Sequence, residues 1–174
     1  MNKKLICTVI LAFILTGCAS SVKRPQVVEF VRYSISPQDQ ISSVSVHLTE
    51  EATRKALDNS MFKPELLLTY VKGVLKAKSL LSESGDQRHP SLEILIKDVR
   101  VRSNFSAIVW GFMAGADFIT ADIVLKDEAG TEIDRFETSV SYAFGGIAGG
   151  QGNSRLAWMY AKFAEQAVEE LVKQ

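Results

Sequence analysis

The sequence is poor in the side chains that most often carry catalysis or bind metals. Among its 174 residues are two histidines and two cysteines. His47 stands beside Leu48 and His89 precedes Pro90, and neither has a cysteine, histidine or carboxylate at the spacing of a metal site. The sequence also contains neither a G-x-S-x-G motif nor a phosphate-binding loop. It therefore predicts no catalytic residue, no metal and no cofactor.

The sequence also lacks an excess of charge and a long apolar run. Its 20 basic and 20 acidic residues give a formal net charge of zero. Nucleic-acid binding normally requires a basic surface, so nucleic acid is not an expected partner. The apolar run at residues 5–15 has 11 residues, whereas a membrane-spanning helix needs about 20. This run is therefore too short to cross a membrane.

The N-terminus, MNKKLICTVILAFILTGCAS, has the features of a secretory signal. Lys3 and Lys4 precede the apolar run, which ends in small residues. Residues 15–18, LTGC, match the lipobox of bacterial lipoprotein signals, in which the cysteine is diacylated on sulfur before cleavage. We therefore predict cleavage between Gly17 and Cys18, lipidation of Cys18 and loss of residues 1–17. A plain secretory signal is the alternative.

Lipidation would fix where the mature chain lies. Cys18 would be its single cysteine and its sulfur would be esterified, which excludes an intramolecular disulfide. Ala19, rather than Asp, follows the cysteine, and in bacteria that resemble the enteric group this favours the outer membrane. Residues 18–25 are predicted to form the lipidated cysteine and a short polar tether with a reach of about 25 Å. The domain would thus stay close to the periplasmic face of that membrane.

Residues 26–174 are predicted to form a single α+β domain. Apolar alternation and turn signals predict strands at 26–33, 41–48, 91–102, 118–126 and 131–142, and helical spacing predicts helices at 50–58, 65–81 and 153–174. The expected architecture is a two-layer sandwich, a mostly antiparallel sheet with two or three helices packed on one face.

Several local features accompany these elements. Thr49 is expected to cap the first helix, and Asn153 or Ser154 the last. A change of parity predicts a β-bulge near residues 97–98, and residues 127–130, DEAG, predict a hairpin turn. The last helix has an apolar stripe of Leu156, Tyr160, Phe163, Ala167 and Leu171. Three aspartates in or beside the hairpin are expected to be solvated on outward faces, namely Asp117, Asp122 and Asp134.

Two charge-free segments flank the hairpin, FSAIVWGFMAGA at 105–116 and AFGGIAGGQG at 143–152. Because the hairpin strands are antiparallel, both segments should lie at the end opposite its turn. Either they are core, packed on the sheet or under the last helix, or they form an exposed apolar patch that contacts a partner or a membrane. In the second interpretation Arg100, Arg102 and Gln151 form the rim. The candidate contact residues are Trp110, Phe112, Met113, Phe144 and Ile147.

The C-terminal half resembles domain-of-unknown-function family 4410, which groups bacterial lipoproteins. The shared pattern is a Gly/Ala-rich segment, a strand, a D-x-x-G turn, a second strand and a Gly-rich lead into the last helix. Here the turn is Asp127–Gly130, and the glycines are Gly111, Gly115, Gly145, Gly146, Gly149 and Gly150. The resemblance implies an envelope lipoprotein and supplies no catalytic residues.

Three functions follow as hypotheses. The first is a non-enzymatic binding or assembly module, lipid-anchored in the outer membrane, that docks an envelope protein through the apolar Gly-rich segments. The second is a small-molecule or lipid carrier with a pocket between sheet and helices. The third is an enzyme, which would require convergent titratable groups in one cleft. The oligomeric state is left open.

Overall fold

A computed structural model of the chain describes residues 18–25, 33–57, 61–82, 89–103, 115–143 and 152–173. Its strands form one sheet in the order β1-β5-β4-β3-β2. The strands are β1 (Cys18–Lys23), β2 (Ser43–Leu48), β3 (Ser91–Arg100), β4 (Asp117–Lys126) and β5 (Glu132–Tyr142), and the helices are α2 (Glu50–Leu57), α3 (Pro64–Ala77) and α5 (Gly152–Val172). Among the strands that the structure describes, β2 and β3 pair in parallel and the other neighbours pair antiparallel. The predicted α+β class and mostly antiparallel sheet are confirmed.

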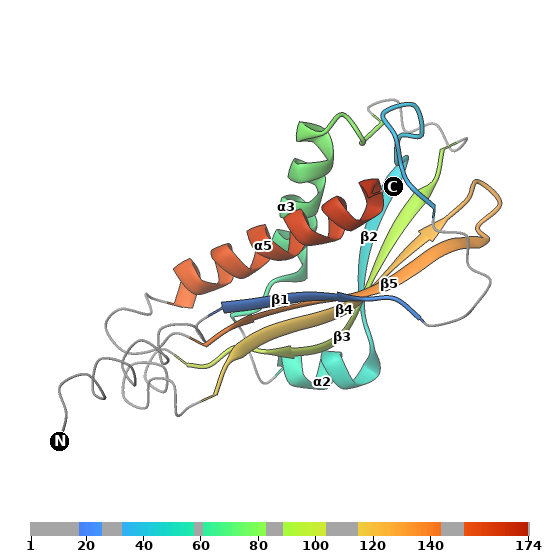
Figure 1. The fold of residues 1–174 in the computed structure, drawn as a ribbon. Helices are drawn as coiled ribbons and strands as arrows, with labels where there is room; N and C mark the ends of the chain where they lie inside the picture. The colour runs from blue at the N-terminus through green and yellow to red at the C-terminus, as the bar shows by residue number, and fades with distance from the viewer. Residues whose placement is uncertain are drawn as a thin grey trace, which may run out of the picture.

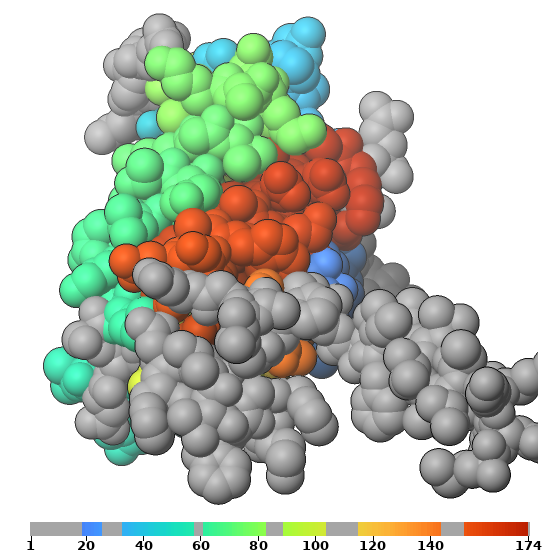
Figure 2. Space-filling view, turned by 90° about the vertical axis from the view of Figure 1, so that its left-hand side faces the viewer, coloured from blue at the N-terminus to red at the C-terminus, as the bar shows by residue number. Residues whose placement is uncertain are grey.

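Helices α3 and α5 cover one face of the sheet, whereas α2 lies beside β3 on the other side (Figure 1). Alternation along the strands sends apolar residues to the covered face. Ile94 of β3 is in register with Ile123 of β4, which pairs with Phe136 of β5, and all three are buried. The predicted stripe of α5 is buried throughout. Figure 2 shows α5 lying across this face between α3 and β1.

The local predictions that rest on short-range patterns are confirmed. The register shifts between Ile96 and Asp98, at the predicted bulge. Gly130 ends the hairpin turn with φ +79°, a conformation that favours glycine. Asp127 Oδ1 accepts hydrogen bonds from the backbone N–H groups of Ala129 and Thr131, at 2.9 and 2.8 Å. The Ala52 N–H donates to Thr49 Oγ1 at 3.2 Å, so Thr49 caps α2.

Two helix boundaries differ from the sequence prediction. Helix α3 ends at Ala77 rather than Leu81, because Ser79 takes φ +58° and turns the backbone out of the helix. Helix α5 begins at Gly152, so Asn153 and Ser154 are exposed residues of its first turn rather than its cap.

The predicted tether is the largest correction. Residues 18–23 form the edge strand β1, which pairs with β5 from Cys18↔Tyr142 to Lys23↔Glu137. Val22 packs against the core, and the three residues before it pair with Ser139, Val140 and Ser141 of β5. This pairing covers an edge of β5 that would otherwise present unpaired backbone groups. The predicted strand at 26–33 lies, apart from Tyr33, outside the described residues, as does the predicted signal peptide.

Candidate functional site

The described residues that flank the two charge-free segments lie at one end of the sheet. Asp117, the first residue of β4, pairs with Tyr142, the last residue of β5, and Tyr142 pairs on its other side with Cys18. We call this part of the molecule the Asp117 end. It comprises Cys18, Asp117, Tyr142, the residues that follow β3 and the first turn of α5. The prediction that the start of β4 and the end of β5 lie together is confirmed, whereas the prediction that the two segments themselves are neighbours lies outside the described residues.

A buried ionic cluster of Asp117, Arg102 and Arg155, which we call the Asp117 cluster, holds the Asp117 end together. Asp117 is fully buried, and the side chains of Arg102 and Arg155 are each 1% exposed. Arg102 donates to Asp117 Oδ1 from its backbone N at 2.6 Å and from Nε at 3.0 Å. Arg155 Nε donates to Asp117 Oδ2 at 2.9 Å. One carboxylate thus joins the start of β4 to the chain after β3 and to α5.

The arginines extend this cluster to neighbouring backbone groups. Arg155 Nη2 donates to the carbonyl of Arg102 at 2.9 Å, and Arg102 Nη2 donates to the carbonyl of Tyr142 at 3.2 Å. Charge-assisted hydrogen bonds of this kind are the strong ones, and here they are shielded from water. The residues that flank each charge-free segment are therefore held by the same three side chains, those of Arg102, Asp117 and Arg155.

The sequence interpretation of three of these charged residues was wrong. Asp117 and Asp134 are buried rather than solvated, and Arg102 is buried rather than part of an exposed rim. Their partners lie far away in the sequence, so no local pattern shows the pairing. One signal was present, since Arg155 lies four residues before Met159 and eight before Phe163, on the buried face of α5.

Gly115, where the first segment rejoins the sheet, has no room for a side chain. Its φ is +81°, and a Cβ built on it would lie 2.7 Å from Arg100 Nη1. A side chain at this position would be strained and would displace Arg100. The candidate contact residues Trp110, Phe112, Met113, Phe144 and Ile147 lie outside the described residues, and so does Gln151.

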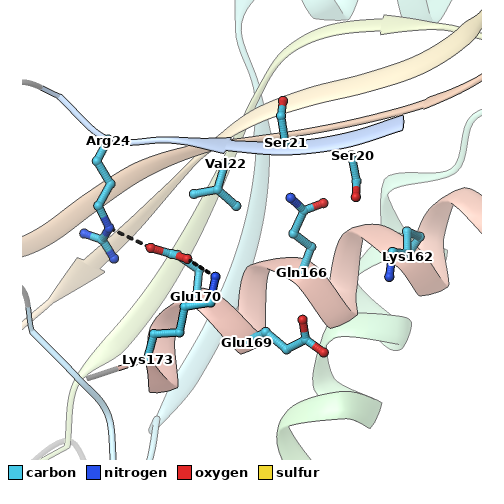
Figure 3. Close-up of a pocket in the computed structure, with 9 residues that line it drawn as sticks. All are labelled: Ser20, Ser21, Val22, Arg24, Lys162, Gln166, Glu169, Glu170 and Lys173. Carbon is cyan, nitrogen blue, oxygen red and sulfur yellow. Dashed lines mark hydrogen bonds and ion pairs between the residues drawn. The ribbon is translucent and has the colours of Figure 1, made fainter. Parts of the chain in front are cut away.

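A second charged cluster fastens β1 to the sheet and helix (Figure 3). Arg24 donates from Nε to Glu170 at 2.8 Å and from Nη1 to Asp134 at 2.6 Å. Its guanidinium lies 5.0 Å from the ring centre of Phe136. Burial alone would lower the pKa of Arg24, but the hydrogen bonds to Asp134 and Glu170 raise it. Arg24 therefore stays charged and joins β1, β5 and α5.

A polar groove lies beside Arg24, between β1 and α5. Its volume is about 520 Å³, and it is open to solvent along much of its length. Charged and polar side chains dominate its walls, which are formed by Ser20, Ser21, Val22 and Arg24 on one side and Lys162, Gln166, Glu169, Glu170 and Lys173 on the other. These walls do not resemble those of an apolar carrier pocket.

The sheet face opposite α3 and α5, where α2 lies beside β3, carries a third set of charges, and we call it the uncovered face. Lys97 bridges Asp122 and Glu137 at 2.9 and 2.5 Å. Arg135 pairs with Glu132 and Asp122, and Lys126 pairs with Glu93. Among the residues that the structure describes, no group of three His, Cys, Asp or Glu side chains could hold a metal. No helix within them is long and apolar enough to cross a membrane.

The sheet, its helices and the Asp117 end together form a small α+β domain. The chain belongs to the family described as Domain of unknown function (DUF4410), whose model matches residues 28–146. A comparison with curated proteins finds no match.

Solved structures show a similar fold. One is the dodecamer of a PelC point variant from Paraburkholderia phytofirmans, 10% identical, with a TM-score of 0.53, covering 90% of this chain and 100% of that chain. A second PelC dodecamer from the same organism is 12% identical with a TM-score of 0.50, and coverage is the same. A minor lipoprotein from Acinetobacter baumannii is 14% identical with a TM-score of 0.44, covering 75% of this chain and 90% of that chain. At these identities the similarity concerns the fold.

Proposed function

We propose that the protein is a lipid-anchored, non-enzymatic module of the bacterial cell envelope that docks an envelope protein through segments 105–116 and 143–152. It would be held by Cys18 at the periplasmic face of the outer membrane. The observation that carries the proposal is the Asp117 cluster, to which the described ends of both segments are fixed. Trp110, Phe112, Met113, Phe144 and Ile147 are the proposed contact residues.

Fixed attachment points for the two segments favour docking for an energetic reason. Binding costs conformational entropy when loops must be ordered, and a surface fixed in advance loses less. The cluster restrains the points from which both segments depart, while their apolar side chains and glycines supply contact area and close backbone approach. Buried charges of this kind contribute positional specificity more than net stability.

The groove and the cluster do not favour the alternatives. A lipid carrier needs an apolar cavity, whereas the groove beside Arg24 is polar and open. An enzyme needs titratable groups that substrate can reach, whereas Asp117 is fully buried between two arginines.

Copies of the chain are a second proposed partner. In the described part of the sheet, β1 and β2 each pair on one side only. Such edges are available for further pairing, and the PelC proteins that share this fold were solved as dodecamers. We expect the acylated protein in detergent to have a mass of several copies by light scattering. A monomer at all concentrations would contradict self-association and leave the docking proposal intact.

In-cell photocrosslinking from position 112 tests the docking proposal directly. We expect a discrete adduct with another envelope protein, identified by mass spectrometry. The matched control is the same crosslinker at Glu128, an exposed residue of the hairpin turn at the far end of the sheet. Adducts from both positions, or intramolecular adducts alone from position 112, would contradict the proposal.

A double substitution, Trp110→Ser with Phe112→Ser, separates surface from core. If the two residues form a contact surface, the thermal unfolding midpoint should change little while the adduct is lost. A protein that unfolds or disappears would assign both residues to the core.

A further inference from the structure

We infer that the Asp117 end of the sheet faces the lipid surface, so that the strands run away from the membrane. This inference rests on the lipid anchor of the proposed function and deepens it, because it puts the proposed docking surface beside the bilayer and so calls for a partner that lies in or at the outer membrane. An anchor alone does not orient a protein, because a flexible tether lets the body turn. The structure supplies three observations that together fix the orientation.

The first observation is that no tether separates Cys18, the proposed lipid anchor, from the sheet. Cys18 is the first residue of β1 and already pairs with Tyr142. Neighbouring strands lie about 4.8 Å apart, so the lipidated residue would be within one strand spacing of β5. A polar tether would have let the body move by about 25 Å. With β1 in the sheet, a lipid on Cys18 brings the Asp117 end to the bilayer.

The second observation is the charge of this end. Together with Arg100, the last residue of β3, its described charged groups are three arginines, the others being Arg102 and Arg155, and one carboxylate, that of the buried Asp117. The exposed polar residues around them, Ser103, Asn153 and Ser154, carry no charge. The net charge of these groups is therefore positive, which is the sign that anionic headgroups attract. The hairpin turn at the opposite end carries Asp127 and Glu128 instead.

The third observation is an aromatic pair next to the anchor. Tyr142, the partner of Cys18 in the sheet, contacts Trp158 of α5 edge to face, with ring centres 5.3 Å apart. Both side chains are partly exposed. Tyr and Trp combine an apolar ring with a polar group, and they gather at the level of the headgroups in membrane proteins.

The orientation has a measurable consequence along the molecule. Strand β5 has 11 residues, so the hairpin turn stands about 35 Å from the Asp117 end. A probe at position 158 should therefore lie near the lipid, and a probe in the turn should lie well outside its reach.

Fluorescence quenching by lipid tests this difference. The acylated full chain is reconstituted in vesicles of phosphatidylethanolamine and phosphatidylglycerol, with brominated acyl chains in the quenching sample. Trp110→Phe leaves Trp158 as the sole tryptophan. The control combines Trp110→Phe and Trp158→Phe with Ala129→Trp in the turn. We expect loss of most of the Trp158 emission and no loss from position 129.

Three other outcomes overturn the inference in distinguishable ways. Quenching at position 129 but not 158 means the opposite orientation, and equal quenching at both positions means a body that turns freely. In either case the anchor and the proposed function still stand. Failure of the acylated chain to float with the vesicles removes the anchor and therefore both proposals.

Hydrogen exchange on the acylated chain without substitutions gives a second test. On vesicles, the amides of residues 142–143 and 152–158 should exchange several-fold more slowly than in detergent, while those of the 127–131 turn should not change. Slower exchange in the turn alone would overturn the orientation.

Discussion

The Asp117 end and the uncovered face of the sheet use the same kinds of ion pair in opposite surroundings. At the Asp117 end, the carboxylate is 0% exposed and both guanidinium side chains are 1% exposed. On the uncovered face, Lys97 is 38% exposed and its partner Glu137 is 24% exposed. The first set fixes chain segments relative to one another. The second set is partly exposed, so water and salt screen its ion pairs.

The comparison teaches that burial, and not the number of pairs, decides what an ion pair does here. Removing one partner of a buried pair leaves a charge without compensation in a medium of low polarity. Removing one partner of an exposed pair leaves a charge that water solvates. The following variants test this difference, beginning with the largest expected effect.

Asp117→Asn should be the most damaging of these changes. It keeps the shape of the side chain but leaves Arg102 and Arg155 with an amide in place of their carboxylate. We expect a loss of about 3–5 kcal/mol in the free energy of unfolding, measured by chemical denaturation. Asp122→Asn on the uncovered face is the control and should cost about 0–1 kcal/mol. Equal losses would remove the distinction between the two regions.

Arg24→Met should have an intermediate effect, because Arg24 is 26% exposed while its partner Asp134 is 3% exposed. The change leaves a buried carboxylate without its guanidinium, and we expect a loss of about 1–3 kcal/mol. Faster amide hydrogen exchange at residues 19–22 would show that β1 has loosened. Lys23→Met, at the neighbouring side chain, which is 74% exposed, is the control and should leave exchange unchanged. If both variants behave alike, Arg24 does not hold β1.

Lys97→Met should have a small effect that depends on salt. It removes the bridge between Asp122 and Glu137, and the expected loss is about 0–1 kcal/mol. Because exposed pairs are screened, the difference from the unchanged protein should shrink in high salt. A loss as large as that of Asp117→Asn would show that this face is more deeply shielded than its exposure indicates.

Acid should weaken the uncovered face gradually. Hydrogen bonds from Lys126, Arg135 and Lys97 lower the pKa values of Glu93, Glu132 and Glu137, respectively. A carboxylate with a lowered folded pKa stabilises the fold fully above its ordinary pKa of about 4.3, and this stabilisation is lost as pH falls through the lower folded pKa. The denaturation midpoint should therefore fall between about pH 5 and pH 3. A double variant, Glu93→Gln with Glu137→Gln, should flatten that fall; an unchanged slope would assign the acid sensitivity to other groups.

The sequence predicts those parts of this fold that depend on neighbouring residues. The hairpin with Gly130, the bulge after Ile96, the Thr49 cap and the stripe of α5 each have a short-range signature. The strand β1 has none, because ASSVK shows no clear alternation and its partner lies at the other end of the chain. The Asp117 cluster escaped prediction for the same reason, since Arg102 and Arg155 are 15 and 38 residues away. The five contact residues and the strand at 26–33 remain predictions.

The pairing of β1 with β5 also sets an order of events in folding. Ala19 and Ser141 face each other although they are 122 positions apart, so β1, the first described strand, has no place in the sheet until β5, the last described strand, is available. Contacts between such distant residues form late, because closing a long loop costs entropy before any contact compensates for it. In the proposed lipoprotein, Cys18 would therefore be joined to the membrane while the segment after it is still a free strand. Insertion of that strand would complete the sheet and draw the folded body down onto the bilayer in a single step.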